Sequence, residues 1–94
     1  MKTTMSSFGN KKINFPTSYD LKIIVDSKVE ETITRKEFEE IASTLEVPNY
    51  GWTSKLSKAG NYTSYTTRVM IKDQEIMDNL YSDLKKITGL KMAI

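Results

Sequence analysis

The sequence predicts an α+β fold in which one four-stranded antiparallel sheet carries both helices on the same face. Strand and helix patterns follow one another in the order β-α-β-β-α-β over residues 15–94. The longest β-favouring run of the chain lies at 62–71, after a glycine turn, which places that strand inside the sheet. Residues 1–14 are polar and basic without periodicity. We therefore expect a disordered basic tail over 1–14 and a single domain over 15–94.

The first strand is expected over residues 19–25, where apolar and polar side chains alternate. Ile24 is the one apolar residue on the face that turns away from the core. The first helix is expected to begin at Thr34, because Glu37 three residues later completes a capping box. Phe38 and the apolar residues at helical spacing after it predict the buried stripe of that helix.

A hairpin of two strands is expected over residues 50–57 and 62–71, joined at Gly60. In the second strand one face is expected to hold four residues and to pack the single tryptophan; its members are Tyr50, Trp52, Ser54 and Leu56. In the third strand Tyr62, Arg68 and Met70 are expected to point away from the core.

The second helix is expected to be capped by Asp73 and to be followed by Gly89 at its end. A last short strand over residues 90–94 is predicted to turn Leu90, Met92 and Ile94 inward and Lys91 outward. Right-handed crossovers join these elements into a ferredoxin-like βαββαβ sandwich with strand order 4-1-3-2.

The composition argues against catalysis. The chain has no cysteine and no histidine, which removes the thiolate nucleophile, the commonest general base and the commonest metal ligands. The acidic stretch around Asp26, Glu30 and Glu31 lacks the spacing and central glycine of a calcium loop. We therefore expect a protein that is not an enzyme and binds no cofactor or metal.

The net charge of +2 arises in the tail. Lys2, Lys11 and Lys12 supply three of the 14 basic residues, and the tail holds none of the 12 acidic ones. The folded domain is therefore close to neutral, which gives little support to nucleic-acid binding. The amino-terminal stretch lacks the apolar run of a signal peptide, and no stretch is long enough to cross a membrane, so the expected compartment is the cytoplasm.

Several local features resemble the YbeD-like family of small bacterial proteins of unknown function. They are Phe15-Pro16 before the first strand, Gly60-Asn61-Tyr62, Leu80-Tyr81, the run from Leu84 to Ile87, and the closing run from Lys91 to Ile94. The resemblance implies a ferredoxin-like fold similar to small regulatory ACT-type domains. It implies no catalytic residue, because the family has no established activity.

The face of the sheet that carries no helix is the candidate site, and we call it the open face. Its expected residues are basic or apolar: Lys22, Ile24, Lys55, Tyr62, Arg68, Met70 and Lys91. Asp20 is the one acid expected there. We expect a regulatory or adaptor module that contacts a protein partner, or a second copy, through this face or through the last strand.

Two other functions stay open. Single-stranded nucleic acids bind sheets of this topology by stacking bases on aromatic side chains of the two central strands. Here the outward residue of the first strand is Lys22 rather than an aromatic, and Tyr62 stands alone at the start of its strand. Small-ligand sensing in the ACT manner would use a glycine-bearing loop after the first strand, and residues 26–32 contain no glycine.

Overall fold

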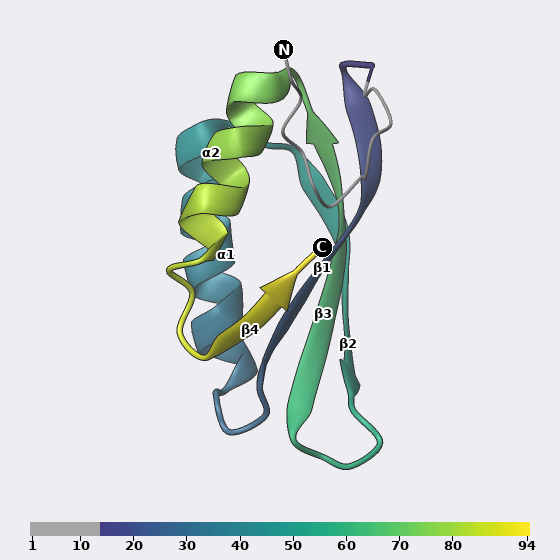
Figure 1. Cartoon of the computed structure of the whole chain (residues 1–94), viewed down its shortest axis with the longest axis vertical. Coiled ribbons are helices and arrows are strands. Elements are labelled where there is room, and N and C mark those ends of the chain that lie inside the picture. Colours follow the sequence, from purple (N-terminus) through teal and green to yellow (C-terminus); the bar gives the residue numbers. More distant parts are fainter. Residues whose placement is uncertain (1–13) are drawn as a thin grey trace.

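The computed structural model describes residues 14–94 as a sheet covered on one face by two helices (Figure 1). The predicted tail lies outside the described residues, apart from Asn14. The elements follow the predicted order: β1 (Thr17–Asp26), α1 (Glu31–Leu45), β2 (Asn49–Leu56), β3 (Tyr62–Ile71), α2 (Gln74–Leu84) and β4 (Leu90–Ala93).

The sheet has the order β2-β3-β1-β4, which is the predicted order counted from the other edge. All three neighbouring pairs are antiparallel. The central pair, β1 with β3, is in register over its full length, from Thr17 opposite Ile71 to Asp26 opposite Tyr62. The ferredoxin-like prediction is confirmed, and this long central pair defines which side chains share a face.

The core lies between the sheet and the helices. Alternate residues of β1 and β3 point into it, and each helix adds an apolar stripe; the buried apolar side chains include Leu21, Ile23, Val25, Phe38, Tyr65, Val69, Ile71, Met77, Leu80 and Leu84. Each large apolar side chain that is fully buried contributes about 1.5–3 kcal/mol relative to an exposed one. Because both helices lie on the same side, no described helix covers the opposite side of the sheet (Figure 1).

The predicted N-cap of α1, Thr34, lies four residues after the observed one. The helix begins at Glu31, and its N-cap residue Glu30 makes no side-chain capping bond. Thr34 instead lies inside the helix on the buried stripe with Phe38 and Ala42, fully buried, and its hydroxyl oxygen has no hydrogen-bond partner. A cap is worth about 1 kcal/mol, which is less than the packing that this stripe gains in the core.

Glu37 also has a different role from the predicted capping box. Its carboxylate accepts hydrogen bonds from the backbone N–H and the hydroxyl of Thr88, both at 2.8 Å, and so ties α1 to the turn after α2. The Asp73 cap of α2 is confirmed, because its carboxylate accepts the Ile76 N–H at 2.9 Å. Gly89 lies beyond the helix, which ends at Leu84; it has a positive φ of 70° in the turn that leads into β4.

Candidate functional site

The open face collects the residues that the sequence placed there. In the register of β1 with β3, Lys22 lies opposite Thr66, Ile24 opposite Ser64, Asp20 opposite Arg68 and Ser18 opposite Met70. Lys55 of β2 lies opposite Ser64 and so shares the same face. The Lys91 ammonium of β4 reaches the ring of Tyr62, with 5.6 Å between the nitrogen and the ring centroid. The structure therefore brings all seven predicted residues to one side of the sheet.

A bulge in β2 adds a residue that the sequence pattern had assigned to the core. Tyr50 lies opposite Arg68 and Thr53 opposite Thr66, so β2 holds one residue more than β3 between these pairs. Gly51 takes a positive φ of 78° inside this bulge. Tyr50 therefore faces the open side and is 72% exposed, and the prediction that it shares a face with Trp52 is wrong.

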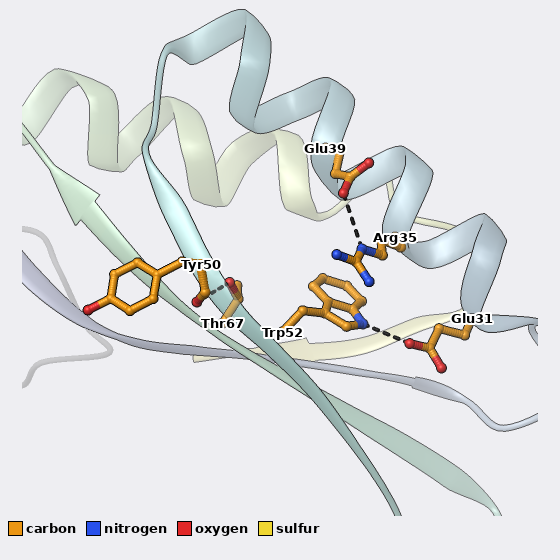
Figure 2. A network of polar contacts seen from close by, with 6 residues as sticks. All are labelled: Glu31, Arg35, Glu39, Tyr50, Trp52 and Thr67. Carbon is orange, nitrogen blue, oxygen red and sulfur yellow. Dashed lines mark hydrogen bonds and ion pairs between the residues drawn. The ribbon is translucent and has the colours of Figure 1, made fainter.

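Trp52 keeps its predicted place between the sheet and α1. Its ring stacks on Tyr65 with 5.1 Å between centroids, and Arg35 of α1 lies over the ring with the guanidinium carbon at 5.3 Å. The indole N–H donates to the Glu31 carboxylate at 2.9 Å. Figure 2 shows Trp52 pointing toward α1 while the Tyr50 ring lies apart from this network. The hydroxyl of Thr67 donates to the Tyr50 carbonyl at 3.1 Å and anchors the bulge.

A second irregularity, in the pairing of β1 with β4, reverses the predicted orientation of two more side chains. The register shifts between Ile24 and Val25, so that Met92 lies opposite Ile24 on the open face. Ile94 exchanges two backbone hydrogen bonds with Lys22, at 2.8 and 2.9 Å, and shares its face. The prediction that Met92 and Ile94 point inward is wrong, although Leu90, opposite core residue Val25, packs against the core as expected.

These corrections make the open face more apolar than the sequence predicted. Seven large hydrophobic side chains of the described residues are exposed, and five of them lie on this face: Tyr50, Tyr62, Met70, Met92 and Ile94. Met92 of β4 and Ile94 just after it lie next to each other, opposite Ile24 and Lys22. Tyr50 lies opposite Arg68 and near Met70, and Tyr62 lies at the start of β3 opposite Asp26. Adjacent exposed apolar side chains of this kind mark interaction surfaces in soluble proteins.

The charges of the open face are only partly compensated. Arg68 donates to the Asp20 carboxylate at 3.1 Å, and both side chains are exposed. Asp26, which the sequence placed in a loop, ends β1 opposite Tyr62 and adds a second acid. Lys22 and Lys55 form no ion pair with another described residue. The face therefore combines apolar side chains with unpaired ammonium groups.

Three tyrosine phenols with a raised pKa lie on the helix side of the sheet. The Tyr19 and Tyr81 hydroxyls share a hydrogen bond of 2.7 Å that joins β1 to α2, and burial raises the pKa of both phenols. Burial also raises the pKa of Tyr65. These phenols remain protonated at neutral pH and serve packing. Between residues 14 and 94 no group of three acidic side chains is placed to hold a metal ion, and no helix there is long and apolar enough to cross a membrane.

Sequence comparison identifies the relatives of this chain. The profile of a family described as protein of unknown function (DUF493) matches residues 10–94. The chain belongs to this family. Relatives include UPF0250 proteins from Shewanella woodyi, 32% identical over 85 residues, and Shewanella halifaxensis, 29% identical over 82 residues; each alignment covers 87% of this chain and 90% of the relative. The resemblance to the YbeD-like family is thereby confirmed, and the DUF493 family has no assigned biochemical role.

Solved structures support the fold of this DUF493 chain. The solution structure of the protein HP0495 from H. pylori superposes with a TM-score of 0.68 at 16% identity, covering 99% of this chain and 98% of the other. The ACT domain from the GTP pyrophosphokinase of Chlorobium tepidum superposes with a TM-score of 0.62 at 10% identity, covering 84% and 96%. At such identities the likeness concerns the fold alone.

Proposed function

We propose that the chain is a non-enzymatic adaptor or regulatory module of the cytoplasm that binds a protein partner through its open face. The observation that carries this proposal is the gathering of five of the seven exposed large hydrophobic side chains on the one sheet face without helices. The unpaired ammonium groups of Lys22 and Lys55 belong to the same face, where Lys22 lies opposite Ile94 and Lys55 lies opposite Ser64. The partner that fits is a protein surface or extended segment that presents apolar side chains together with carboxylates.

The edge of the sheet beside Met92 supports the same proposal. Because Ile94 directs both backbone bonds toward Lys22, the peptide groups of the preceding residue, Ala93, point to the outside of β4. Among the described residues no strand pairs with β4 on that side. An extended partner segment that adds to this edge would lay alternate side chains against Met92 and Ile94.

The geometry favours a protein over a single-stranded nucleic acid. Base stacking needs free aromatic faces near the middle of the sheet, whereas Lys22 and Thr66 occupy the centre of the open face. One side of the Tyr62 ring is already covered by the Lys91 ammonium. Arg68, the one arginine of this face, is neutralised by Asp20.

The proposal can be tested by site-specific crosslinking in bacterial cells. A photoreactive benzoylphenylalanine is placed in the full chain at Met70 or Met92 on the open face, or at Lys36 on the exposed side of α1 as the control. We expect a defined crosslinked protein from the two open-face positions and none from Lys36. Crosslinks of equal yield from Lys36 would contradict the proposal.

The crosslinked protein is then purified and its affinity is measured by calorimetry. Lys22→Glu places a like charge against the carboxylates of the partner, so we expect binding to weaken about tenfold at low salt. Lys85→Glu, on the exposed end of α2, is the matched charge control and should bind like the wild type. Unchanged affinity of Lys22→Glu would show that the open face does not make the contact.

A further inference from the structure

A pocket of about 320 Å³ lies at the end of the sheet where three distant segments meet. The end of β1 and the loop after it contribute residues 26–28, the turn after β2 and the first residue of β3 contribute 60–62, and β4 contributes Lys91. We call it the sheet-end pocket. Its volume falls at the lower end of the range of small-molecule sites, about 300–1,000 Å³.

Hydrogen bonds between the segments form the walls of the sheet-end pocket. The Ser27 N–H donates to the Asn61 carbonyl at 3.0 Å, and the Ser27 hydroxyl donates to the Gly60 carbonyl at 2.7 Å. The Asp26 N–H donates to the Gly89 carbonyl at 2.9 Å, which fixes the loop against the start of β4. The pocket is therefore built before any ligand arrives, and a ligand would not have to order these loops.

The charges lining the pocket are unbalanced. Lys28 and Lys91 both line it, and neither forms an ion pair with another described residue. Asp26 is the one acid of the lining, and its carboxylate accepts the backbone N–H of Lys28 at 2.8 Å. The Lys91 ammonium lies over the Tyr62 ring rather than beside a carboxylate. The lining therefore holds two lysines and one aspartate, and the aspartate carboxylate already accepts a backbone hydrogen bond.

We infer that the sheet-end pocket binds the phosphate or carboxylate group of a small anion. Lysine ammonium groups form strong charge-assisted hydrogen bonds with oxyanions, and the side chains of Asn61 and Tyr62 add further donors at the same pocket. The pocket shares Asp26, Tyr62 and Lys91 with the end of the open face, but binding of a small anion needs no apolar contact. The inference does not depend on the proposed protein partner.

The test is a ¹⁵N NMR titration of the full chain with inorganic phosphate and, separately, with succinate, against sodium chloride at matched ionic strength. We expect saturable shifts of the amides of Ser27, Lys28, Asn61 and Tyr62 with a Kd in the millimolar range for at least one of the two oxyanions. The better ligand tells whether a phosphate or a dicarboxylate is the natural class. Scattered, non-saturating shifts, or shifts that chloride reproduces, would overturn the inference.

Charge-neutral variants complete the test. Lys28→Gln and Lys91→Gln should each weaken binding of the oxyanion at least fivefold, whereas Lys85→Gln on α2 should leave it unchanged. Urea unfolding of each variant establishes that the fold is intact. Binding that survives in both pocket variants would refute the assignment of the site. Because phosphate and succinate are tested without any protein partner, this result is independent of the crosslinking experiment.

Discussion

Replacing Gly89 with alanine tests how β4 is joined to the loop after β1. Gly89 has a φ of 70°, and a Cβ atom at this position would lie 2.7 Å from the Val29 Cγ2 atom. The left-handed conformation costs an L-residue about 1–2 kcal/mol, and forcing an extra carbon into a packed site costs about 1–3 kcal/mol. We therefore expect Gly89→Ala to lower the free energy of unfolding by about 2–5 kcal/mol.

Gly60→Ala is the matched control for this prediction. Gly60 also has a positive φ, of 82°, but a Cβ atom there would meet nothing within 4 Å. Its substitution should cost only the conformational part, about 1–2 kcal/mol. The single tryptophan, Trp52, stacks on Tyr65, so its fluorescence reports unfolding in urea for every variant.

A double-mutant cycle with Val29→Ala separates the two contributions. Removing the Val29 methyl groups removes the contact, so Gly89→Ala measured in the Val29→Ala background should cost about 1–2 kcal/mol, as Gly60→Ala does. The reasoning is refuted if Gly89→Ala costs no more than Gly60→Ala. It is equally refuted if the cost of Gly89→Ala is the same in both backgrounds.

Three further changes test the core, a helix end and the buried phenols. Thr34→Val should raise the free energy of unfolding by about 1–2 kcal/mol, because it removes a buried hydroxyl without a partner. The hydroxyl of Thr67 is equally buried but donates a hydrogen bond, so Thr67→Val should lower the free energy of unfolding. Asp73→Ala should cost about 1 kcal/mol in urea unfolding through loss of the α2 cap. Burial raises the pKa of Tyr19 and Tyr81 in the folded chain, so the unfolded chain loses these protons at a lower pH than the folded chain does. The free energy of unfolding should therefore fall as the pH rises above about 10.

Each of these outcomes has a clear contrary result. Equal effects of the two threonine variants would show that the hydrogen-bond state of the hydroxyl does not matter. If Asp73→Ala unfolds at the same urea concentration as the wild type, the Asp73 cap does not stabilise α2. For the phenols, absorbance titration should show that Tyr19 and Tyr81 ionise above the ordinary pKa of tyrosine, and Tyr81→Phe should flatten the alkaline loss of stability. An unchanged alkaline profile in that variant would contradict the assigned burial.

Much of the fold could be predicted because its signals are local. Alternation along β1 identifies its two faces, and the Asp73 cap and the apolar stripe of α2 identify that helix. The start of α1 could not be predicted in this way. Thr34 has the features of a cap, but the helix needs this position on its buried stripe above Phe38 and Ala42, and packing of the whole stripe outweighs one cap.

The sequence predicted where the candidate site lies, but it did not predict all of the residues that form it. Lys22, Ile24, Arg68 and Met70 lie on strands with an uninterrupted register, so alternation alone assigned them to the open face. Tyr50, Met92 and Ile94 were missed because each lies on an edge strand whose pairing contains a bulge. Gly51 in the middle of a predicted strand was the one available signal of such a bulge.

The sequence by itself determined the order of the elements, the central position of β3 and the absence of histidine and cysteine chemistry, because these follow from composition and from patterns a few residues long. Only the tertiary structure decided which face the edge strands present. One extra residue in a strand reverses the direction of every side chain beyond it. Whether a strand contains such a residue is set by its pairing with the neighbouring strand, not by the alternation of its own sequence. The apolar character of the open face and the meeting of Lys28 with Lys91 at the sheet-end pocket therefore arise from pairing between distant segments.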